Sequence, residues 1–237
     1  MLLFSAADQI NEDTIEVKDE RLTHLLSVHR AKMGDSVRVG ELNGLMGAGE
    51  IVRIDQSGAS ITYNLDTAPP PKLPVRLVLA LPRPKMLRRI LRSVAEFGVP
   101  HLHLINSHRV EKSYWQTPVL KEAALQRYLL AGLEQARDTV MPSVSCHTLF
   151  KPFVEDELPH LAEGKKALVF HPGEAATDIN NAAGEQELVL VIGPEGGFIS
   201  YEVERLESIG CTQVSLGPRI LRVENAVSAA LAHYLAH

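Results

Sequence analysis

Two glycine-rich segments near the C-terminus, Val191-Ile-Gly-Pro-Glu-Gly-Gly-Phe198 and Leu216-Gly-Pro-Arg-Ile-Leu-Arg-Val-Glu-Asn-Ala226, decide the fold class of this chain. Each follows an apolar run typical of a buried strand, Leu188 to Ile192 and Val214 to Leu216, and each precedes a predicted helix. In an open α/β sheet, ligands bind at the loops beyond the carboxyl ends of the strands. The two segments therefore predict a ligand site built from two turns.

The first segment has the composition of a turn that contacts a small molecule. Gly193, Gly196 and Gly197 surround a Pro-Glu pair, and glycine adopts positive φ angles and lets bare backbone approach a ligand. The segment lacks the G-x-G-x-x-G fingerprint and the G-x-x-x-x-G-K-[ST] phosphate loop, so a dinucleotide or a nucleoside triphosphate fits poorly. An ordinary strand-to-helix turn is the alternative interpretation.

The second segment adds charged side chains and leads into an alanine-rich helix. Arg219 and Arg222 are followed by Glu224 and Asn225 at the start of this predicted helix. Its apolar stripe consists of Val223, Ala226, Val227, Ala230, Leu231 and Tyr234. The small residues on the helix allow another helix to approach closely, within the chain or from a second subunit, and we favour a subunit interface.

The rest of the chain predicts two domains. Short β-prone runs at 36–40, 50–55 and 59–63 indicate a small barrel over residues 1–67. A stiff Pro-rich linker follows over 68–74. From residue 75 to 237, strands alternate with helices, which predicts an α/β domain with a largely parallel sheet.

The two segments together resemble the RsmE family, ribosomal RNA small subunit methyltransferase E, of the SPOUT superfamily. The resemblance rests on Gly-Pro-Glu-Gly-Gly at 193–197 followed by Leu-Gly-Pro-Arg-Ile-Leu-Arg-x-Glu at 216–224. It continues in Ala95-Glu-Phe-Gly-Val99, in Glu134-Gln135 and in the segment from His24 to Gly44, so it covers nearly the whole chain.

This resemblance implies an enzyme that uses S-adenosylmethionine to methylate N3 of a uridine in the decoding region of 16S rRNA, on the assembled 30S subunit. It implies a PUA-like RNA-binding barrel, an α/β domain with a deep trefoil knot, and a homodimer. It also implies cofactor contacts, mainly through backbone groups of the two loops. The positions concerned are His171, Ile192, Gly193, Glu195, Gly197, Leu216, Gly217, Pro218, Leu221 and Asn225.

Two further residues are candidates for the reaction itself. We expect Arg222 to polarise the uracil carbonyls, and Glu224 to orient that arginine or to serve as the base. An Arg-Glu pair that caps the last helix is the alternative interpretation of both. For His171 the alternative is a turn histidine in solvent.

A cluster of cations marks the start of the second domain. Its members, together with Arg30 of the first domain, are our candidate RNA-binding residues: Arg83, Lys85, Arg88, Arg89 and Arg92. Clustered cations suit phosphate contacts, which position RNA without reading its sequence. A solvated helix face with i, i+4 pairs such as Arg92 and Glu96 is weighed equally.

The chain also departs from the family pattern at Ser93, Ala95, Asp138 and Asn225. The cofactor loops are spared, and we expect the departures to fall where RNA or the catalytic centre lies. They leave the precise target nucleotide open.

Composition excludes several other functions. A net charge of −5 argues against nucleic-acid binding by the whole surface. The ten histidines show no metal-binding spacing, so we expect no metal site. No membrane span or signal peptide is recognisable, and we expect a cytoplasmic protein. Cys146 and Cys211 are expected to be buried and reduced.

Three functions remain compatible with the sequence. The first is a uridine methyltransferase of the RsmE type, and the second is a SPOUT enzyme that acts on another RNA position. The third is a non-catalytic RNA-binding or ribosome assembly factor of the same fold.

Overall fold

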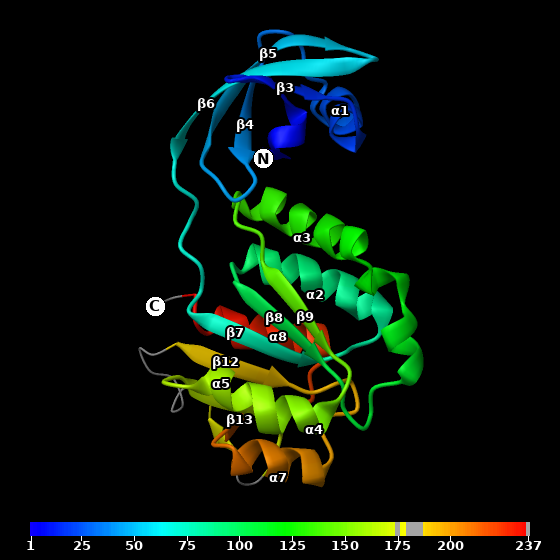
Figure 1. The fold of residues 1–237 in the computed structure, drawn as a ribbon, viewed down its shortest axis with the longest axis vertical. Coiled ribbons are helices and arrows are strands. Elements are labelled where there is room, and N and C mark those ends of the chain that lie inside the picture. Colours follow the sequence, from blue (N-terminus) through cyan, green and yellow to red (C-terminus); the bar gives the residue numbers. More distant parts are fainter. Residues whose placement is uncertain (174–175, 179–186, 236–237) are drawn as a thin grey trace. The chain divides into compact units, whose positions relative to one another are not determined.

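The computed structural model describes residues 1–173, 176–178 and 187–235, and the chain divides into two compact units (Figure 1). The first unit comprises Met1–Pro71 and Leu133–Met141, and the second comprises Lys72–Gly132 and Pro142–His237.

The first unit is a curled, half-barrel sheet of six strands in the order β1-β4-β5-β6-β3-β2. Its strands are β1 (Leu2–Phe4), β2 (Gln9–Asn11), β3 (Thr14–Val17), β4 (Ser36–Glu41), β5 (Met46–Asp55) and β6 (Gly58–Thr67). Three short helical segments accompany them: η1 (Ala6–Asp8), α1 (Glu20–His24) and η2 (Leu25–His29). The core of the unit consists of alternating inward side chains such as Ile15, Val39, Ile51 and Ile61, all fully buried.

A later part of the chain returns to this unit. The Thr139 hydroxyl donates to the Gly44 carbonyl at 2.6 Å, and the Met141 amide donates to Asn43 Oδ1 at 2.9 Å. These bonds stabilise the turn between β4 and β5, in which Asn43 adopts a positive φ of 62°. No local sequence pattern indicates this return, because it depends on contacts between residues almost a hundred positions apart.

The second unit is built on a sheet of seven strands in the order β11-β13-β10-β12-β7-β8-β9, and all of its described strand pairs are parallel. The strands are β7 (Val75–Ala80), β8 (His101–Ile105), β9 (Ser143–His147), β10 (Lys166–Phe170), β11 (Thr177–Asp178), β12 (Leu188–Ile192) and β13 (Thr212–Ser215). The predicted α/β class with a parallel sheet is confirmed. Leu216, predicted at the end of a strand, instead lies one residue beyond β13.

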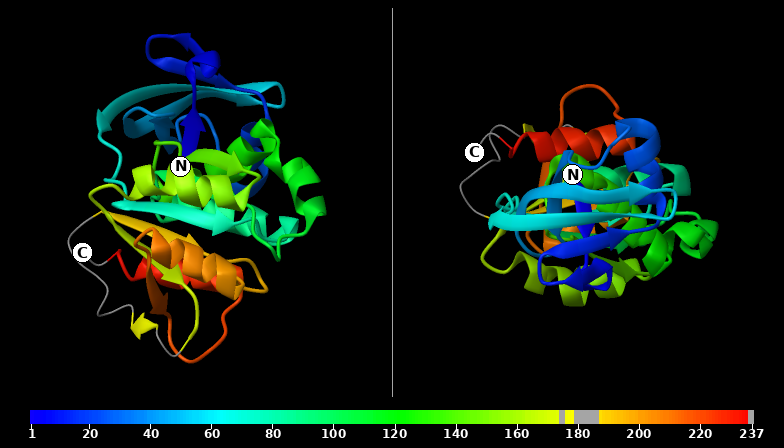
Figure 2. Two further views of the ribbon diagram at one scale, coloured as in Figure 1. Left: turned by 60° about the horizontal axis from the view of Figure 1, so that its bottom comes forward. Right: turned by 90° about the horizontal axis from the view of Figure 1, so that it is seen from above.

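Helices cover both faces of this sheet, with α2 and α8 on one face and the α4–α5 segment on the other (Figures 1 and 2). The helical segments are α2 (Pro84–Glu96), η3 (Lys112–Gln116), η4 (Pro118–Leu120), α3 (Glu122–Ala136), α4 (Phe150–Pro152), η5 (Phe153–Glu157), α5 (Leu158–Ala162), α7 (Ser200–Ser208) and α8 (Val223–Ala232). Because both faces are covered, all five residues of the central strand β12 are buried.

The helix α2 shows how the sequence sets these boundaries. Pro84 occupies the first turn, where its missing N–H costs nothing, and the apolar residues of the helix are buried against the sheet. Gly98, with a positive φ of 71°, ends the helix as expected and donates its amide to the Ala95 carbonyl.

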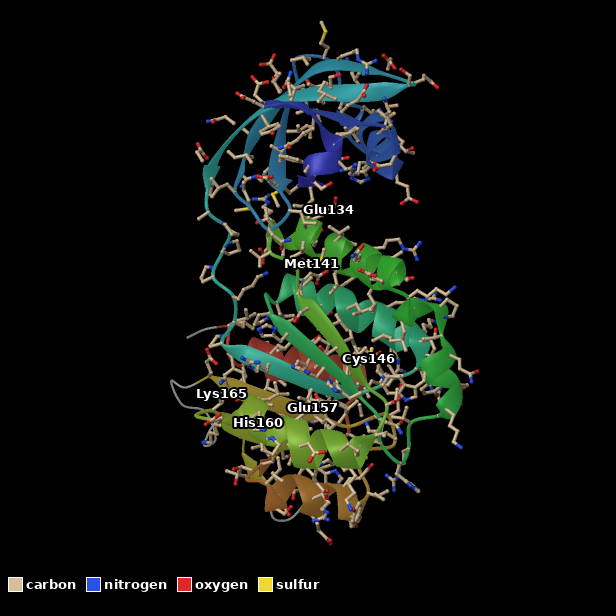
Figure 3. All side chains as sticks on the ribbon, viewed as in Figure 1. Glu134, Met141, Cys146, Glu157, His160 and Lys165 are labelled. Atoms are coloured by element: carbon tan, nitrogen blue, oxygen red, sulfur yellow. The ribbon has the colours of Figure 1, made fainter. Side chains whose placement is uncertain are left out.

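The two cysteines differ in their surroundings. Cys211 is buried, and burial raises the pKa of its thiol to about 12. The expectation that Cys146 is buried is wrong, since it is exposed on β9 (Figure 3). The reason is that β9 is an edge strand of the sheet, which no local pattern reveals.

Two other expectations concern features beyond the sheet itself. The trefoil knot implied by the resemblance stays a prediction. Within the described ranges, none of the helices is long and apolar enough to cross a membrane.

Candidate functional site

A cavity of about 290 Å³ lies at the carboxyl ends of β10, β12 and β13. Parallel strands end at the same edge of a sheet, so the turns that follow these three strands meet there. Their residues line the cavity together with Val223 and Ala226 of α8. Its volume is close to the lower end of the range of about 300–1,000 Å³ found for small-molecule sites.

The cavity gathers most of the residues implied for cofactor binding. Eight of these ten positions line it: His171, Ile192, Gly193, Glu195, Gly197, Leu216, Gly217 and Leu221. The other two, Pro218 and Asn225, are exposed and are not among the lining residues. The roles of all ten stay predictions, but one cavity brings together residues from 171 to 221.

The lining also includes residues that were not predicted from the sequence as cofactor contacts. They are Phe170, Pro172, Pro194, Gly196, Val214, Ser215, Arg219, Ile220, Val223 and Ala226. Most are neighbours of predicted residues within the same turns. The sequence could have indicated Ala226, because it follows Val223 by three positions and therefore lies on the same face of the helix.

The glycines of the first turn are required by its geometry. Gly197 has a positive φ of 71°, and its amide donates to the Pro194 carbonyl at 2.8 Å to close the turn. A Cβ atom at Gly193 would lie 3.2 Å from both the ring and the amide nitrogen of Phe198, a buried residue. At these two glycines the turn therefore presents backbone rather than a side chain to the cavity.

Neighbouring segments hold this first turn in place. The carboxylate of Glu195 accepts a hydrogen bond from the Arg83 amide at 3.0 Å, and the Arg109 guanidinium donates to the Gly196 carbonyl. Below the turn, Glu202 of α7 is only 3% exposed. Its two carboxylate oxygens accept bonds from the amides of Ile199, at 3.0 Å, and His108, at 2.7 Å. Glu202 thus ties the loop after β12 to the loop after β8.

The second turn is more open. Gly217 has a positive φ of 103°, and a Cβ atom there would meet no other atom within 4 Å. The Gly217 amide donates to the Ser215 hydroxyl at 3.2 Å, which defines the start of the turn. Ile220 is 93% exposed although it is apolar. The turn therefore combines an accessible backbone with an exposed apolar side chain.

His171 belongs to the cavity wall and is fixed through its backbone. Its amide donates to the Val214 carbonyl at 3.1 Å, and its carbonyl accepts from Gln213 Nε2 at 3.0 Å. Burial and the nearby positive charge of Arg109 lower the pKa of the imidazole. The ring is therefore neutral near pH 7 and does not repel a cationic ligand.

The candidate catalytic residues lie at the start of α8. Arg222 is the exposed N-cap residue, and Glu224 lies in the first turn with a side chain that is 15% exposed. The ion pair described for Glu224 joins its Oε1 to Nη1 of Arg89 on α2, at 3.9 Å. This partner was not predicted from the sequence, and it brings a candidate RNA-binding residue next to a candidate catalytic one.

The candidate RNA-binding residues of the second unit share one feature, since all five are exposed or partly exposed: Arg83, Lys85, Arg88, Arg89 and Arg92. Arg92 lies over the ring of Tyr128, 5.6 Å from its centroid, a cation–π contact that competes with the expected pairing to Glu96. In the first unit Arg30 is exposed as well, at the end of η2, with a positive φ of 50°.

Two of the departures from the family pattern are not where we expected them. Ala95 and Asp138 are 0% and 2% exposed, so they lie in the interior rather than on an RNA-binding surface. Ala95 lies where α2 and α3 are in close contact, since a Cβ atom at Gly132 would be 2.8 Å from the Ala95 methyl group. Asp138 accepts a bond from the Val140 amide at 3.0 Å.

The histidines of β8 and β9 form a chain of contacts outside the cavity. His103 Nδ1 lies 3.2 Å from His147 Nε2, and His147 Nδ1 lies 3.2 Å from Glu157 Oε1, which extends from η5 (Figure 3). Burial lowers the pKa of His103 to about 4. In the part of the chain that the structure describes, no group of three or more His, Cys, Asp or Glu residues is placed to hold a metal ion.

Comparison with known proteins identifies the class to which this fold and cavity belong. Residues 69–235 match the RNA methyltransferase domain family, so the second unit is an RNA methyltransferase domain. The chain belongs to the RsmE family of RNA methyltransferases.

Individual relatives agree with this assignment over nearly the full length. The ribosomal RNA small subunit methyltransferase E of Treponema pallidum is 28% identical over 226 residues, covering 94% of this chain and 85% of the relative. Its Bacillus subtilis counterpart is 26% identical and covers 94% of this chain and 90% of the relative. The crystal structure of the Neisseria gonorrhoeae enzyme, bound to S-adenosyl methionine, covers 98% of this chain and 96% of its own. That structure is 20% identical and superimposes with a TM-score of 0.77, which shows a common fold.

Proposed function

We propose that this protein transfers the methyl group of S-adenosylmethionine to N3 of a uridine in the decoding region of 16S rRNA, with the assembled 30S subunit as substrate. The observation that carries the proposal is the cavity, whose lining includes eight of the ten positions implied for the cofactor. The names of the relatives, and the S-adenosyl methionine bound by the Neisseria gonorrhoeae enzyme, support the same reaction.

The cavity has the properties that this cofactor requires. Its walls combine apolar side chains, such as Ile192, Leu216 and Leu221, with backbone groups at glycines. An adenine ring and a short aliphatic chain fit the former, and backbone N–H and C=O groups can bind the polar edges of the ligand. Glu195 lines the same cavity, and its negative charge favours a ligand that carries a positively charged sulfonium and amino group.

The protein side chains then have two tasks. When bound, the cofactor supplies a methyl group that its sulfonium already activates. Arg222 polarises the uracil carbonyls and stabilises the negative charge that develops as N3 loses its proton. Glu224 accepts that proton, with its carboxylate oriented by Arg89 at 3.9 Å. Alignment of the two reactants lowers the barrier by several kcal/mol, and a positioned base adds about 10²- to 10⁴-fold.

We further propose that the exposed cations of α2 and Arg30 contact phosphates of the rRNA, and that the protein acts as a homodimer. The accessible cations on and beside α2 support the RNA contact. Replacing Lys85 by Ala should weaken binding uniformly across RNA sequences and reduce the slope of log K against log[salt] by about 1.

The roles of the catalytic residues are tested by separating binding from transfer. Arg222→Ala should abolish methyl transfer to small ribosomal subunits while S-adenosylmethionine affinity, measured by calorimetry, stays within about three-fold. Arg205→Ala is the matched control. Neither arginine lines the cavity, but Arg222 lies between the lining residues Leu221 and Val223, whereas Arg205 lies on α7 and pairs with Glu155. Equal loss of affinity and of transfer in Arg222→Ala would contradict the role proposed for this arginine.

A further inference from the structure

The segment that follows β8 is held against the turn after β12, which lines the cavity. This segment carries an aromatic side chain whose role the proposed reaction does not explain. The segment is held by Arg109, which bonds to the Gly196 carbonyl, and by the His108 amide, which donates to Glu202. Further along, Trp115 Nε1 donates to Asn106 Oδ1 at 3.1 Å. Tyr114, in η3, is therefore part of a segment that several hydrogen bonds hold in place.

Tyr114 lies between Glu111 and Arg83. Its hydroxyl donates to Glu111 Oε1 at 3.0 Å and is close enough to the Arg83 guanidinium for the two groups to interact. Arg83 is at the same time the residue whose amide donates to Glu195, a lining residue of the cavity. The aromatic ring is thus linked through Arg83 to the rim of the proposed cofactor site.

The state of this hydroxyl limits what the side chain can still bind. Because the hydroxyl already donates to Glu111 and lies close to the Arg83 guanidinium, its donor capacity is used within the protein. Tyr114 is half-buried, so the interaction left to it is contact with the accessible part of its ring. The Arg83 guanidinium lies close to the hydroxyl of this residue, and Lys112, two residues earlier in the chain, is exposed.

An aromatic ring held in a fixed orientation beside cations is the combination with which proteins bind unpaired nucleotides. Bases stack on the ring and the cations contact the phosphate backbone. We propose that Tyr114 and Arg83 form a nucleobase-binding site, in which an unpaired base next to the target nucleotide stacks on the Tyr114 ring and Arg83 contacts its phosphate. This inference rests on the proposed function, because it takes RNA to be the substrate of the adjacent cavity.

The test measures RNA affinity separately from methyl transfer. The probe is a fluorescently labelled single-stranded oligouridylate, and the anisotropy titration compares the native protein with Tyr114→Leu and Tyr114→Phe. Stacking predicts that Tyr114→Leu lowers affinity about ten-fold, while Tyr114→Phe keeps it within about three-fold because the ring remains. S-adenosylmethionine affinity should stay unchanged in both variants.

The chain offers a matched control and an internal reporter. Tyr201 of α7 likewise lies next to an arginine: its hydroxyl accepts a hydrogen bond from Arg205, which pairs with Glu155 at 3.0 Å. Tyr201→Leu therefore removes a similar group away from the proposed site. The sequence contains one tryptophan, Trp115, next to Tyr114. Its fluorescence should be quenched by the oligouridylate in the native protein, which a purely structural role of Tyr114 does not predict.

The outcomes separate this inference from the proposed function. Equal oligouridylate affinity in the native protein and in Tyr114→Leu, or an equal loss in Tyr201→Leu, overturns the nucleobase site. Methyl transfer to 30S subunits with an unchanged KM in Tyr114→Leu overturns it as well and leaves the proposed reaction intact. Oligouridylate binding that depends on Tyr114, without transfer to 30S subunits by the native protein, supports the site and contradicts the proposed reaction.

Discussion

Glu202 is the residue whose removal has the most calculable effect on this structure. Glu202 is 3% exposed, and its carboxylate accepts two backbone hydrogen bonds, from Ile199 at 3.0 Å and from His108 at 2.7 Å. In Glu202→Ala both partly buried N–H groups lose their acceptor. Each such group costs about 1–3 kcal/mol, so we expect a loss of about 2–6 kcal/mol in the free energy of unfolding.

This loss can be measured by thermal unfolding. For a unit of this size, 1 kcal/mol corresponds to about 2–4 °C, so a loss of about 3 kcal/mol lowers Tm by about 6–12 °C. Circular dichroism of the purified variant would follow the transition. Glu202→Gln keeps one acceptor oxygen at the same place and should lose clearly less than Glu202→Ala.

The control lies two residues further along the same helix. Glu204 is exposed, so Glu204→Ala should change the free energy of unfolding by less than about 0.5 kcal/mol. Equal unfolding temperatures of Glu202→Ala and Glu204→Ala would refute the role assigned to the two backbone hydrogen bonds.

Three other predictions follow from the site and its surroundings. Gly197→Ala and Gly164→Ala both place a Cβ atom at a positive φ, 71° and 68°, without a clash, so each variant should lose about 1–2 kcal/mol of stability. Only Gly197→Ala should also weaken S-adenosylmethionine binding. Equal cofactor affinities of the two variants would contradict this prediction. Because burial lowers the pKa of His103 to about 4 from its usual 6.5, the unfolded state binds more protons between these values, and stability should fall as pH drops from about 6.5 to about 4. In urea titrations at several pH values, the free energy of unfolding of His103→Phe should depend less on pH than that of the native protein. An unchanged pH dependence in this variant would assign the effect to other groups. Ala226→Leu should fill part of the cavity and reduce cofactor affinity at least ten-fold, whereas Ala229→Leu, exposed on the same helix, should not.

Those parts of the fold that depend on local patterns could be predicted from the sequence. The run Leu188–Ile192 was predicted as a buried strand and is β12 with the same bounds, because a strand covered on both faces must be apolar throughout. Leu216 was misassigned to a strand for a related reason. It is apolar because it lines the cavity, and hydrophobicity alone does not distinguish the two roles.

Contacts between distant segments could not be predicted in the same way. The ion pair between Arg89 and Glu224 joins two helices that are far apart in the sequence. The local pattern instead suggested Arg222 as the partner of Glu224, although residues two positions apart do not face each other on a helix. The close approach of Gly132 on α3 to Ala95 is equally non-local, although the spacing of four residues from the buried Leu91 already places Ala95 on the buried face of α2.

The cavity itself was largely predictable, since its position follows from the rule that turns after parallel strands meet at one edge. It was harder to predict which residues of these turns line the cavity. Pro218 and Asn225 belong to the second segment, yet neither is among the lining residues. Turn geometry, set by Gly217 and the Ser215 hydroxyl, decides this, and it cannot be inferred from the order of residues alone.

The measurement that tests the central claim most directly is methyl transfer from labelled S-adenosylmethionine to small ribosomal subunits that lack the modification, with the methylated nucleotide located by mass spectrometry. The proposed function predicts a label at N3 of a uridine in the decoding region of 16S rRNA. Measurable cofactor binding without any label on these subunits would contradict it, and would mean that the enzyme acts on a different RNA.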